Sequence, residues 1–129
     1  MKMPFQPGDQ RRYDTRVTED KLARFDAGLV HPVYSTFALG RDAEWACRLF
    51  VLDMLEPGEE GVGAFLSIRH HAPAPPGAEI RITATLAGAE GRRIRCTWEA
   101  RHGSRLIASG EQEQHILRKA DFDAYLATL

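Results

Sequence analysis

The sequence predicts an α+β fold in which a curved antiparallel β-sheet wraps around one long central helix. Two patterns carry this prediction: a helical stripe of apolar residues in the first half of the chain, and an alternation of apolar and polar residues from Val62 onward. A chain of 129 residues suits a single domain. We expect residues 1–32 to form an N-terminal strand and a short flap, residues 33–118 the core, and residues 119–129 a C-terminal helical turn.

The central helix is predicted to run from Asp42 to Leu55. The side of this helix that lies opposite its main apolar face also carries large apolar residues, namely Trp45, Leu49 and Leu52. A helix that is apolar nearly all round is buried. The spacing 3, 1, 3, 1, 3 defines its main apolar face, which consists of Ala43, Ala46, Cys47, Phe50, Val51 and Met54.

Both ends of the chain carry weaker signals. Thr18 could cap a short helix over Glu19–Ala27, which Gly28 would end. At the other end, residues 121–129 are predicted to form an amphipathic helical turn or two.

The second half of the chain predicts strands with one buried face. Turns are predicted at PAPPG, at Glu90-Gly91 and at His102-Gly103, and the last strand should run from Arg105 to about Leu117 with a bulge at Gly110. Arg93, Arg95 and Glu99 should be exposed. The residues expected on the inner face are Ala64, Leu66, Ile68 and His70, then Ile80, Ile82, Ala84 and Leu86, then Ile94, Cys96, Trp98 and Ala100. This arrangement is the hotdog plan, although ferredoxin-like and cystatin-like sheets also fit the pattern.

Composition and charge exclude several classes of function. The net charge of −1 argues against nucleic-acid binding, and no apolar run reaches the roughly 18 residues of a membrane span. The N-terminus has no apolar core typical of a signal peptide, so we expect a cytoplasmic protein. Cys47 and Cys96 are too few for a metal knuckle or a disulfide framework, and we interpret both as buried small side chains.

Several spaced motifs resemble one known family. Residues 34–77 read YSTFALGRDAEWACRLFVLDMLEPGEEGVGAFLSIRHHAPAPPG, and residues 91–101 read GRRIRCTWEAR. A hydroxyl residue, a Glu-Trp pair eight positions later, LEPGE, a Gly-Ala step and a histidine before a proline-rich turn are similar to the hotdog thioesterases of the fluoroacetyl-CoA thioesterase type. The resemblance extends from about Val33 to Gly110.

The resemblance implies site residues at matching positions. Thr36 matches the active-site threonine of the family, Glu44 its helix glutamate and His70 its histidine, while the backbone N–H of Gly63 would bind the thioester oxygen. The chain departs from the family at Tyr34 and Ser35, two further candidates for substrate contact, and in a shortened lid segment before them. Since selectivity for a fluorinated acyl group is thought to depend on that lid, we expect only the reaction class to be shared.

The residues themselves allow plainer interpretations. Glu44 lies at the edge of the buried helix face, where desolvation would suit a carboxylate to general-base or nucleophilic work, but it could also pair with Arg48 one turn on. Alternation places His70 on the inner face and His71 on the outer face, and a histidine on an apolar face is often only a satisfied core residue. Thr36 or its neighbour Ser35 could be a helix cap, and which of the two faces the site stays open.

The expected function is hydrolysis of a small or short-chain acyl-CoA thioester, with CoA as part of the substrate and with no metal or bound cofactor. We expect at least a homodimer, or a dimer of dimers. One alternative is a non-catalytic hotdog module that binds an acyl-CoA or a hydrophobic small molecule. Another is hydration or dehydration of an acyl-CoA on the same fold.

Overall fold

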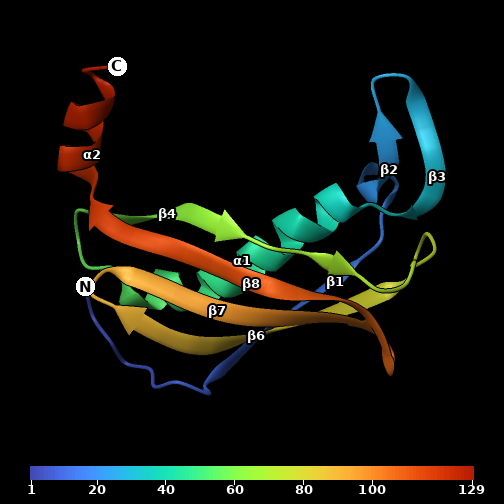
Figure 1. Cartoon of the computed structure of the whole chain (residues 1–129), viewed down its shortest axis with the longest axis horizontal. Helices are drawn as coiled ribbons and strands as arrows, with labels where there is room; N and C mark the ends of the chain where they lie inside the picture. The colour runs from blue at the N-terminus through green and yellow to red at the C-terminus, as the bar shows by residue number, and fades with distance from the viewer.

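The computed structural model describes residues 1–129 and has an α+β architecture (Figure 1). Helix α1 (Thr36–Met54) packs against the inner face of a six-stranded antiparallel sheet in the order β1-β6-β7-β8-β4, with β5 also paired to β8. The hotdog arrangement predicted from the sequence is therefore confirmed. The strands of this sheet are β1 (Gln10–Arg16), β4 (Glu59–Leu66), β5 (Arg69–His70), β6 (Glu79–Glu90), β7 (Arg93–His102) and β8 (Arg105–Arg118).

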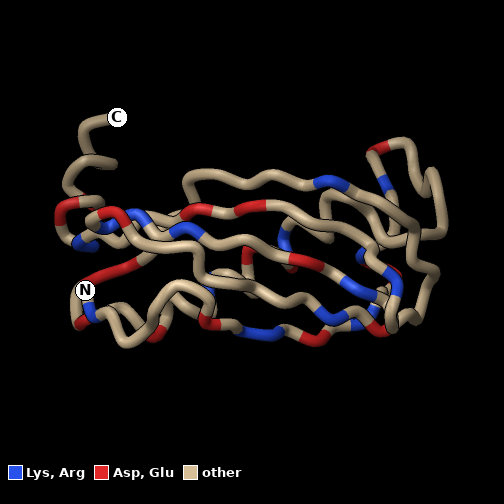
Figure 2. Tube along the Cα trace, turned by 60° about the horizontal axis from the view of Figure 1, so that its bottom comes forward, with Lys and Arg blue, Asp and Glu red and all other residues tan.

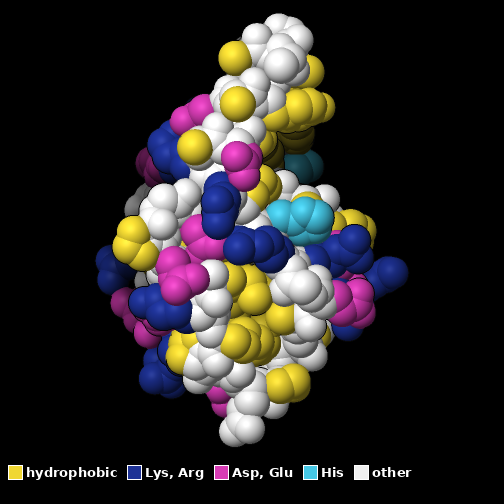
Figure 3. Space-filling model, turned by 90° about the vertical axis from the view of Figure 1, so that its left-hand side faces the viewer, with side chains coloured by type: hydrophobic (Ala, Val, Ile, Leu, Met, Phe, Trp, Pro, Cys, Tyr) yellow, Lys and Arg dark blue, Asp and Glu magenta, His cyan; other side chains and the backbone are white.

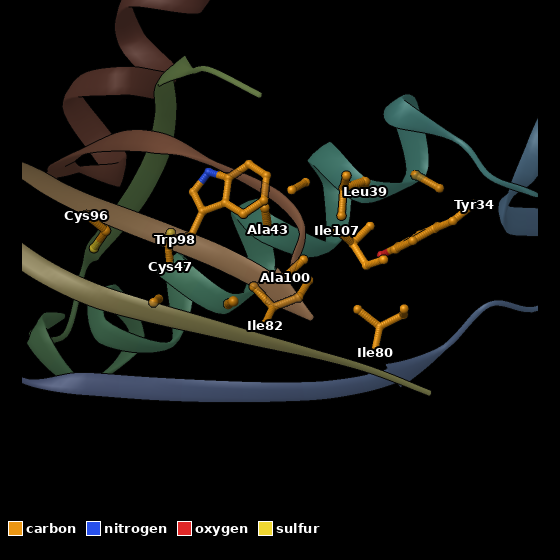
Figure 4. Close-up of a cluster of buried hydrophobic side chains, with 14 of the residues drawn as sticks. Tyr34, Leu39, Ala43, Cys47, Ile80, Ile82, Cys96, Trp98, Ala100 and Ile107 are labelled. Carbon is orange, nitrogen blue, oxygen red and sulfur yellow. The ribbon is translucent and has the colours of Figure 1, made fainter. Parts of the chain in front are cut away.

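The core lies between α1 and the sheet, as the close-up shows (Figure 4). Trp98 on β7 is 1% exposed, and it lies among buried side chains of α1, β6 and β8. All six residues of the predicted helix stripe are buried, as are the predicted inner positions of β6 and β7, while Arg93, Arg95 and Glu99 are exposed. The predicted register of these two strands is therefore correct.

Helix α1 begins six residues before the predicted start. Ser35 has extended backbone angles, and its hydroxyl accepts a hydrogen bond from the N–H of Ala38 at 3.0 Å, so it caps the helix. Gly40 and Arg41 interrupt the apolar spacing, which hid the first turns from the sequence pattern. Leu39 is nevertheless fully buried, and its burial ties the first turns to the core.

The predicted N-terminal helix over Glu19–Ala27 is wrong. The chain forms only a 3-10 turn, η1 (Glu19–Lys21), followed by a hairpin of β2 (Leu22–Phe25) and β3 (Gly28–Tyr34). The Thr18 hydroxyl donates to the Asp20 carboxylate rather than capping a helix backbone, and Gly28 adopts a φ of +112° next to the hairpin turn. The predicted flap is thus a two-stranded hairpin.

Backbone hydrogen bonds hold the base of this hairpin to the body of the protein. The N–H of Ser35 donates to the carbonyl of Lys21 at 2.8 Å, and the N–H of Tyr34 donates to the carbonyl of Ala74 at 2.9 Å. Leu22 is buried in the core. In contrast, Phe25 near the tip is 73% exposed, so the hairpin stands away from the sheet (Figure 1).

The strand predicted to continue from Val62 to His70 is divided into two pieces. A bulge falls between Gly63 and Phe65, and β4 ends before Ser67. The expectation that residues 64, 66, 68 and 70 share one buried face therefore fails for Ala64, which is exposed, and Leu66 is also exposed, where it lines a pocket. Beyond the break, β5 pairs with β8 again through Arg69 and His70.

Gly110 does not form the predicted bulge. It pairs in register with Trp98, and the register shifts between β7 and β8 lie elsewhere, at Ala100/Arg101. A Cβ on Gly110 would come 1.8 Å from the carbonyl oxygen of Ser67. The glycine is needed because the backbone between β4 and β5 approaches β8 this closely.

Helix α2 (Lys119–Leu126) follows β8 directly and projects from one end of the molecule, with hydrophobic side chains visible along it (Figure 3). It buries none of its residues, and Tyr125 is 60% exposed. The predicted C-terminal helical turn is present, and of its large apolar side chains Phe122 is half-buried while Tyr125 and Leu126 are exposed.

Charged residues of both signs are distributed along the chain (Figure 2). On the exposed face of β1 and β6, Arg81 pairs with Asp14 at 3.0 Å and Arg16 pairs with Glu79 at 2.9 Å. Exposed pairs of this kind stabilise a protein little. Neither helix combines the length and the apolar character that crossing a membrane requires.

The contact at Gly110 predicts a large effect of one methyl group. Gly110→Ala should lower the free energy of unfolding by about 3 kcal/mol, because the added Cβ would overlap backbone atoms that cannot move aside. Chemical denaturation would measure this change. Glu111→Ala, an exposed neighbour on the same strand, is the control and should stay within about 0.5 kcal/mol of the parent. Equal stability of the parent and Gly110→Ala would contradict the close approach.

Candidate active site

A pocket of about 410 Å³ lies between the first half of α1 and the segment around β4 and β5. Thr36, Gly40 and Glu44 are spaced four residues apart and so follow one another along the helix, with about 12 Å between the first and the last. A Cβ on Gly40 would come 2.8 Å from Cδ1 of Ile68, so the glycine allows the apolar wall to lie against the helix. The pocket is lined by Thr36, Phe37, Gly40, Arg41, Glu44, Leu66 and Ile68.

Thr36 lies at one end of this pocket and contacts His70, which is outside the pocket lining. The Thr36 hydroxyl lies 3.0 Å from Nδ1 of His70, and Nε2 of the same ring is buried with no hydrogen-bond partner. Desolvation lowers the pKa of His70, the charge of His71 lowers it further, and the backbone of Ala72 partly opposes the shift. Burial therefore favours the neutral form of the His70 ring.

The adjacent histidine points elsewhere. Nε2 of His71 lies 2.8 Å from the hydroxyl of Ser109, and its side chain is exposed. The two rings thus have separate partners, in agreement with the alternation of the strand. No group of three or more His, Cys, Asp and Glu side chains is arranged to hold a metal ion.

Glu44 lies at the other end of the pocket and contacts Gly63, which lines a second pocket. A Cβ on Gly63 would lie only 2.2 Å from Oε1 of Glu44, so the carboxylate rests directly on the glycine. The same oxygen accepts a hydrogen bond of 3.3 Å from Nε2 of Gln112. Thr36 and Glu44 therefore lie at opposite ends of one pocket, where Thr36 is paired with His70 and Glu44 with Gly63.

Glu44 does not form the direct ion pair with Arg48 that its spacing allows. Nη1 of Arg48 instead donates to the carbonyl of Gly61 at 2.8 Å and to Oε1 of Gln114 at 3.2 Å. Glu44 also lines a second, larger pocket of about 640 Å³ on the other side, together with Lys21, Arg41 and Trp45. The carboxylate thus lies at the boundary of two pockets.

Tyr34 and Ser35, the two further candidates, have structural contacts and line neither pocket. Tyr34 is 1% exposed, and its hydroxyl donates to Asp42, which is itself paired with Lys21 at 3.0 Å. Burial, and then this hydrogen bond, raise the pKa of Tyr34. Ser35 caps α1, so Thr36 is the hydroxyl that faces the site.

Sequence analysis missed two polar residues beside the site. Gln112 and Gln114 on β8 are each 1% exposed and point to the inner face. The sequence did contain a signal, because in EQEQHI these glutamines share the phase of Ile116, which is buried. Polar residues at inner positions of a strand require partners, and here the partners lead to Glu44.

Comparison with known proteins supports the fold described above. A fluoroacetyl-CoA thioesterase from Streptantibioticus cattleyicolor is 37% identical over 81 residues, which cover 63% of this chain and 58% of the relative. A thioesterase superfamily member from Thermus thermophilus is 38% identical, with a TM-score of 0.92 over 97% of this chain and 93% of the other. A fluoroacetyl-CoA thioesterase variant in complex with fluoroacetate and CoA is 30% identical, with a TM-score of 0.84 over 92% and 99% of the two chains.

The fold, together with these relatives, defines a hotdog-fold thioesterase. The family model described as fluoroacetyl-CoA-specific thioesterase matches residues 17–120, and the chain belongs to that family. The resemblance seen in the sequence motifs is thereby confirmed.

The contact between Gly63 and Glu44 predicts a separation of folding from activity. Gly63→Ala should leave the melting temperature nearly unchanged, because the atom that its Cβ meets is the end of a side chain that can turn away. Thioester hydrolysis should fall about 10²-fold, since the carboxylate would leave its position. Ala64→Ser at the next, exposed position is the control. Full activity of Gly63→Ala would show that the position of Glu44 does not matter.

Proposed function

We propose that this thioesterase hydrolyses a small or short-chain acyl-CoA to the free acid and CoA. The observation that carries this proposal is the pocket along α1, with Thr36 at one end in contact with His70 and Glu44 at the other in contact with Gly63. Family membership supports the reaction class, and a relative has been crystallised with fluoroacetate and CoA.

The proposed roles follow from the chemistry of each group. Glu44 either activates water or attacks the thioester carbonyl itself, and the backbone N–H of Gly63 polarises the carbonyl oxygen. The carbon–sulfur bond breaks, the acyl group gains the hydroxyl of water, and the remaining proton passes to the thiolate of CoA. A neutral His70 suits that transfer because it can accept and return a proton, and Thr36 orients its ring.

The walls of the pocket favour a small acyl group. Leu66, Ile68 and Phe37 give it apolar sides, while Gly40 forms part of its lining. The rest of the CoA ester must extend beyond this pocket because of its size. A thiol-release assay with acyl-CoA esters from acetyl to long-chain and aryl forms would identify the preferred acyl group.

Site variants test the proposed roles. Glu44→Gln and His70→Ala should each lower kcat/KM by about 10²-fold or more on the best thioester, as is typical for general acid–base groups. Thr36→Ala should cost less, because its hydroxyl only forms a hydrogen bond. The matched control is His71→Ala, whose ring contacts Ser109 outside the pocket and whose loss should leave turnover nearly unchanged.

Two outcomes would contradict this assignment. If His71→Ala is damaged as strongly as His70→Ala, the face that carries the chemistry has been misassigned. If all the variants hydrolyse the best thioester as well as the parent, the proposed residue roles are wrong. If the parent binds acyl-CoA without turnover, the protein is a binding module.

Selectivity for fluorine is not expected. The segment before Thr36 is a short hairpin, and Tyr34 and Ser35 make structural contacts rather than contacts in the pocket. The kcat/KM values for fluoroacetyl-CoA and acetyl-CoA should therefore agree within about tenfold, a difference of roughly 1.4 kcal/mol in transition-state binding. A preference of several orders of magnitude for the fluorinated ester would overturn this prediction.

A homodimer is also part of the proposal. Strand β4 is an edge strand, and beside it α1 exposes large apolar residues, of which Phe37 is 86% and Trp45 42% exposed. Exposed edges and apolar patches are typical of association surfaces. Light scattering at micromolar concentration should give at least twice the mass of one chain, and a monomer would contradict this proposal. The cytoplasmic location stays a prediction from the sequence.

A further inference from the structure

A continuous line of hydrogen bonds links Arg48 to Glu44 through two buried glutamines. Nη1 of Arg48 lies 3.2 Å from Oε1 of Gln114, and Nε2 of Gln114 lies 3.1 Å from Oε1 of Gln112. Nε2 of Gln112 then lies 3.3 Å from Oε1 of Glu44. Both glutamines are only 1% exposed, so water does not compete for these contacts. We call Arg48, Gln114 and Gln112 the relay.

The direction of the relay is fixed at its cationic end. A guanidinium group can only donate hydrogen bonds, whereas a glutamine amide has one accepting and one donating end. Arg48 therefore holds the oxygen of Gln114 toward itself, which turns the NH₂ of Gln114 toward Gln112. The same constraint turns the NH₂ of Gln112 toward Glu44. Each amide orientation follows from the previous one.

This direction distinguishes the two oxygens of Glu44. Oε1 receives the last donor of the relay and rests against Gly63, while the structure records no hydrogen bond to Oε2. A donor aimed at a carboxyl oxygen favours the ionised form, and a cation at the far end strengthens it. We propose that Arg48, Gln114 and Gln112 are positioning residues that hold the carboxylate of Glu44 in place, with Oε1 anchored and Oε2 free for reaction. This inference rests on the proposed role of Glu44.

Other ionisable groups also face Glu44, and none of them is substituted in the variants described below. On the helix itself these are Arg41, Arg48 and Cys47. Strands β4 and β8 contribute only Gly63 and the neutral Gln112 at contact distance. The remaining groups are Tyr13, Asp20 and Lys21 across the larger pocket, Asp42, which is also on α1, and Cys96 on β7, which contacts Cys47.

The test is Gln114→Glu, which keeps the shape of the side chain and reverses the relay. A carboxylate beside Arg48 can only accept, so Gln112 must turn its NH₂ toward residue 114 and its oxygen toward Glu44. Gln112 then offers no donor to Glu44, and the carboxylate loses its anchor. The titration midpoint of the Glu44 carboxyl, followed by ¹³C NMR and assigned by its loss in Glu44→Gln, should rise by about one pH unit or more. The acid limb of kcat/KM should move in the same direction.

A double-mutant cycle separates the relay from the plain effect of an added negative charge. With Gln112→Met in place, the relay is interrupted, and Gln114→Glu should move the midpoint by less than about half as much. A shift of equal size in both backgrounds would show a direct charge effect and overturn the inference. Glu113→Gln is the matched control. It exchanges the same two residue types one position away, keeps the backbone carbonyl that Gln112 contacts, and should leave the midpoint unchanged.

A thermal melt would show whether Gln114→Glu folds. If it does not fold, Gln112→Met alone tests the inference. It removes the donor to Glu44 without adding a charge, so the midpoint must rise, and an unchanged midpoint would overturn the inference. A failure of the proposed function can be distinguished from a failure of this inference. If Glu44→Gln keeps full turnover, Glu44 has no catalytic role, yet the NMR midpoints still report whether the relay acts on its carboxyl.

Discussion

The packing of α1 into the curved sheet is the contact on which the rest of the structure depends. Ala43, Ala46 and Cys47 are fully buried, and their small side chains allow the sheet to approach the helix closely. Because the buried stripe fixes the rotation of the helix, it also fixes which residues face the edge of the sheet. Thr36, Gly40 and Glu44 are brought to the pocket in this way, without a loop to position them. Catalytic groups on a packed helix are held more precisely than groups on a loop.

The sequence predicted those elements that pack against only one other element and expose their other face to solvent. Strands β6 and β7 alternate cleanly because one face meets the helix and the other meets solvent, so their register could be deduced. The break between β4 and β5 could not, because it depends on the close approach of Ser67 to Gly110, which is 43 positions away in the chain. The start of α1 was hidden for a related reason. Gly40 is present to accommodate Ile68, and that contact is visible only in the fold.

The candidate site was predicted in its residues but not in its arrangement. Motif resemblance indicated Thr36, Glu44, His70 and Gly63, and alternation correctly separated His70 from His71. Periodicity gives the face that a residue occupies and not its distance from residues on other elements. The division into two pairs therefore appeared only in the structure, as did the relay, whose glutamines resemble surface residues in a list of amino acids.

The way in which the β2–β3 hairpin is attached affects how this protein could diversify. Its base is tied to Lys21, Ala74 and the buried Leu22, whereas its tip at Asp26 and Ala27 is exposed. Exposed loop tips tolerate insertions well. Residues added there would lengthen the hairpin without moving Ser35, and so without changing where α1 begins. Evolution or a designer can thus vary the hairpin as an independent module while the catalytic frame stays constant.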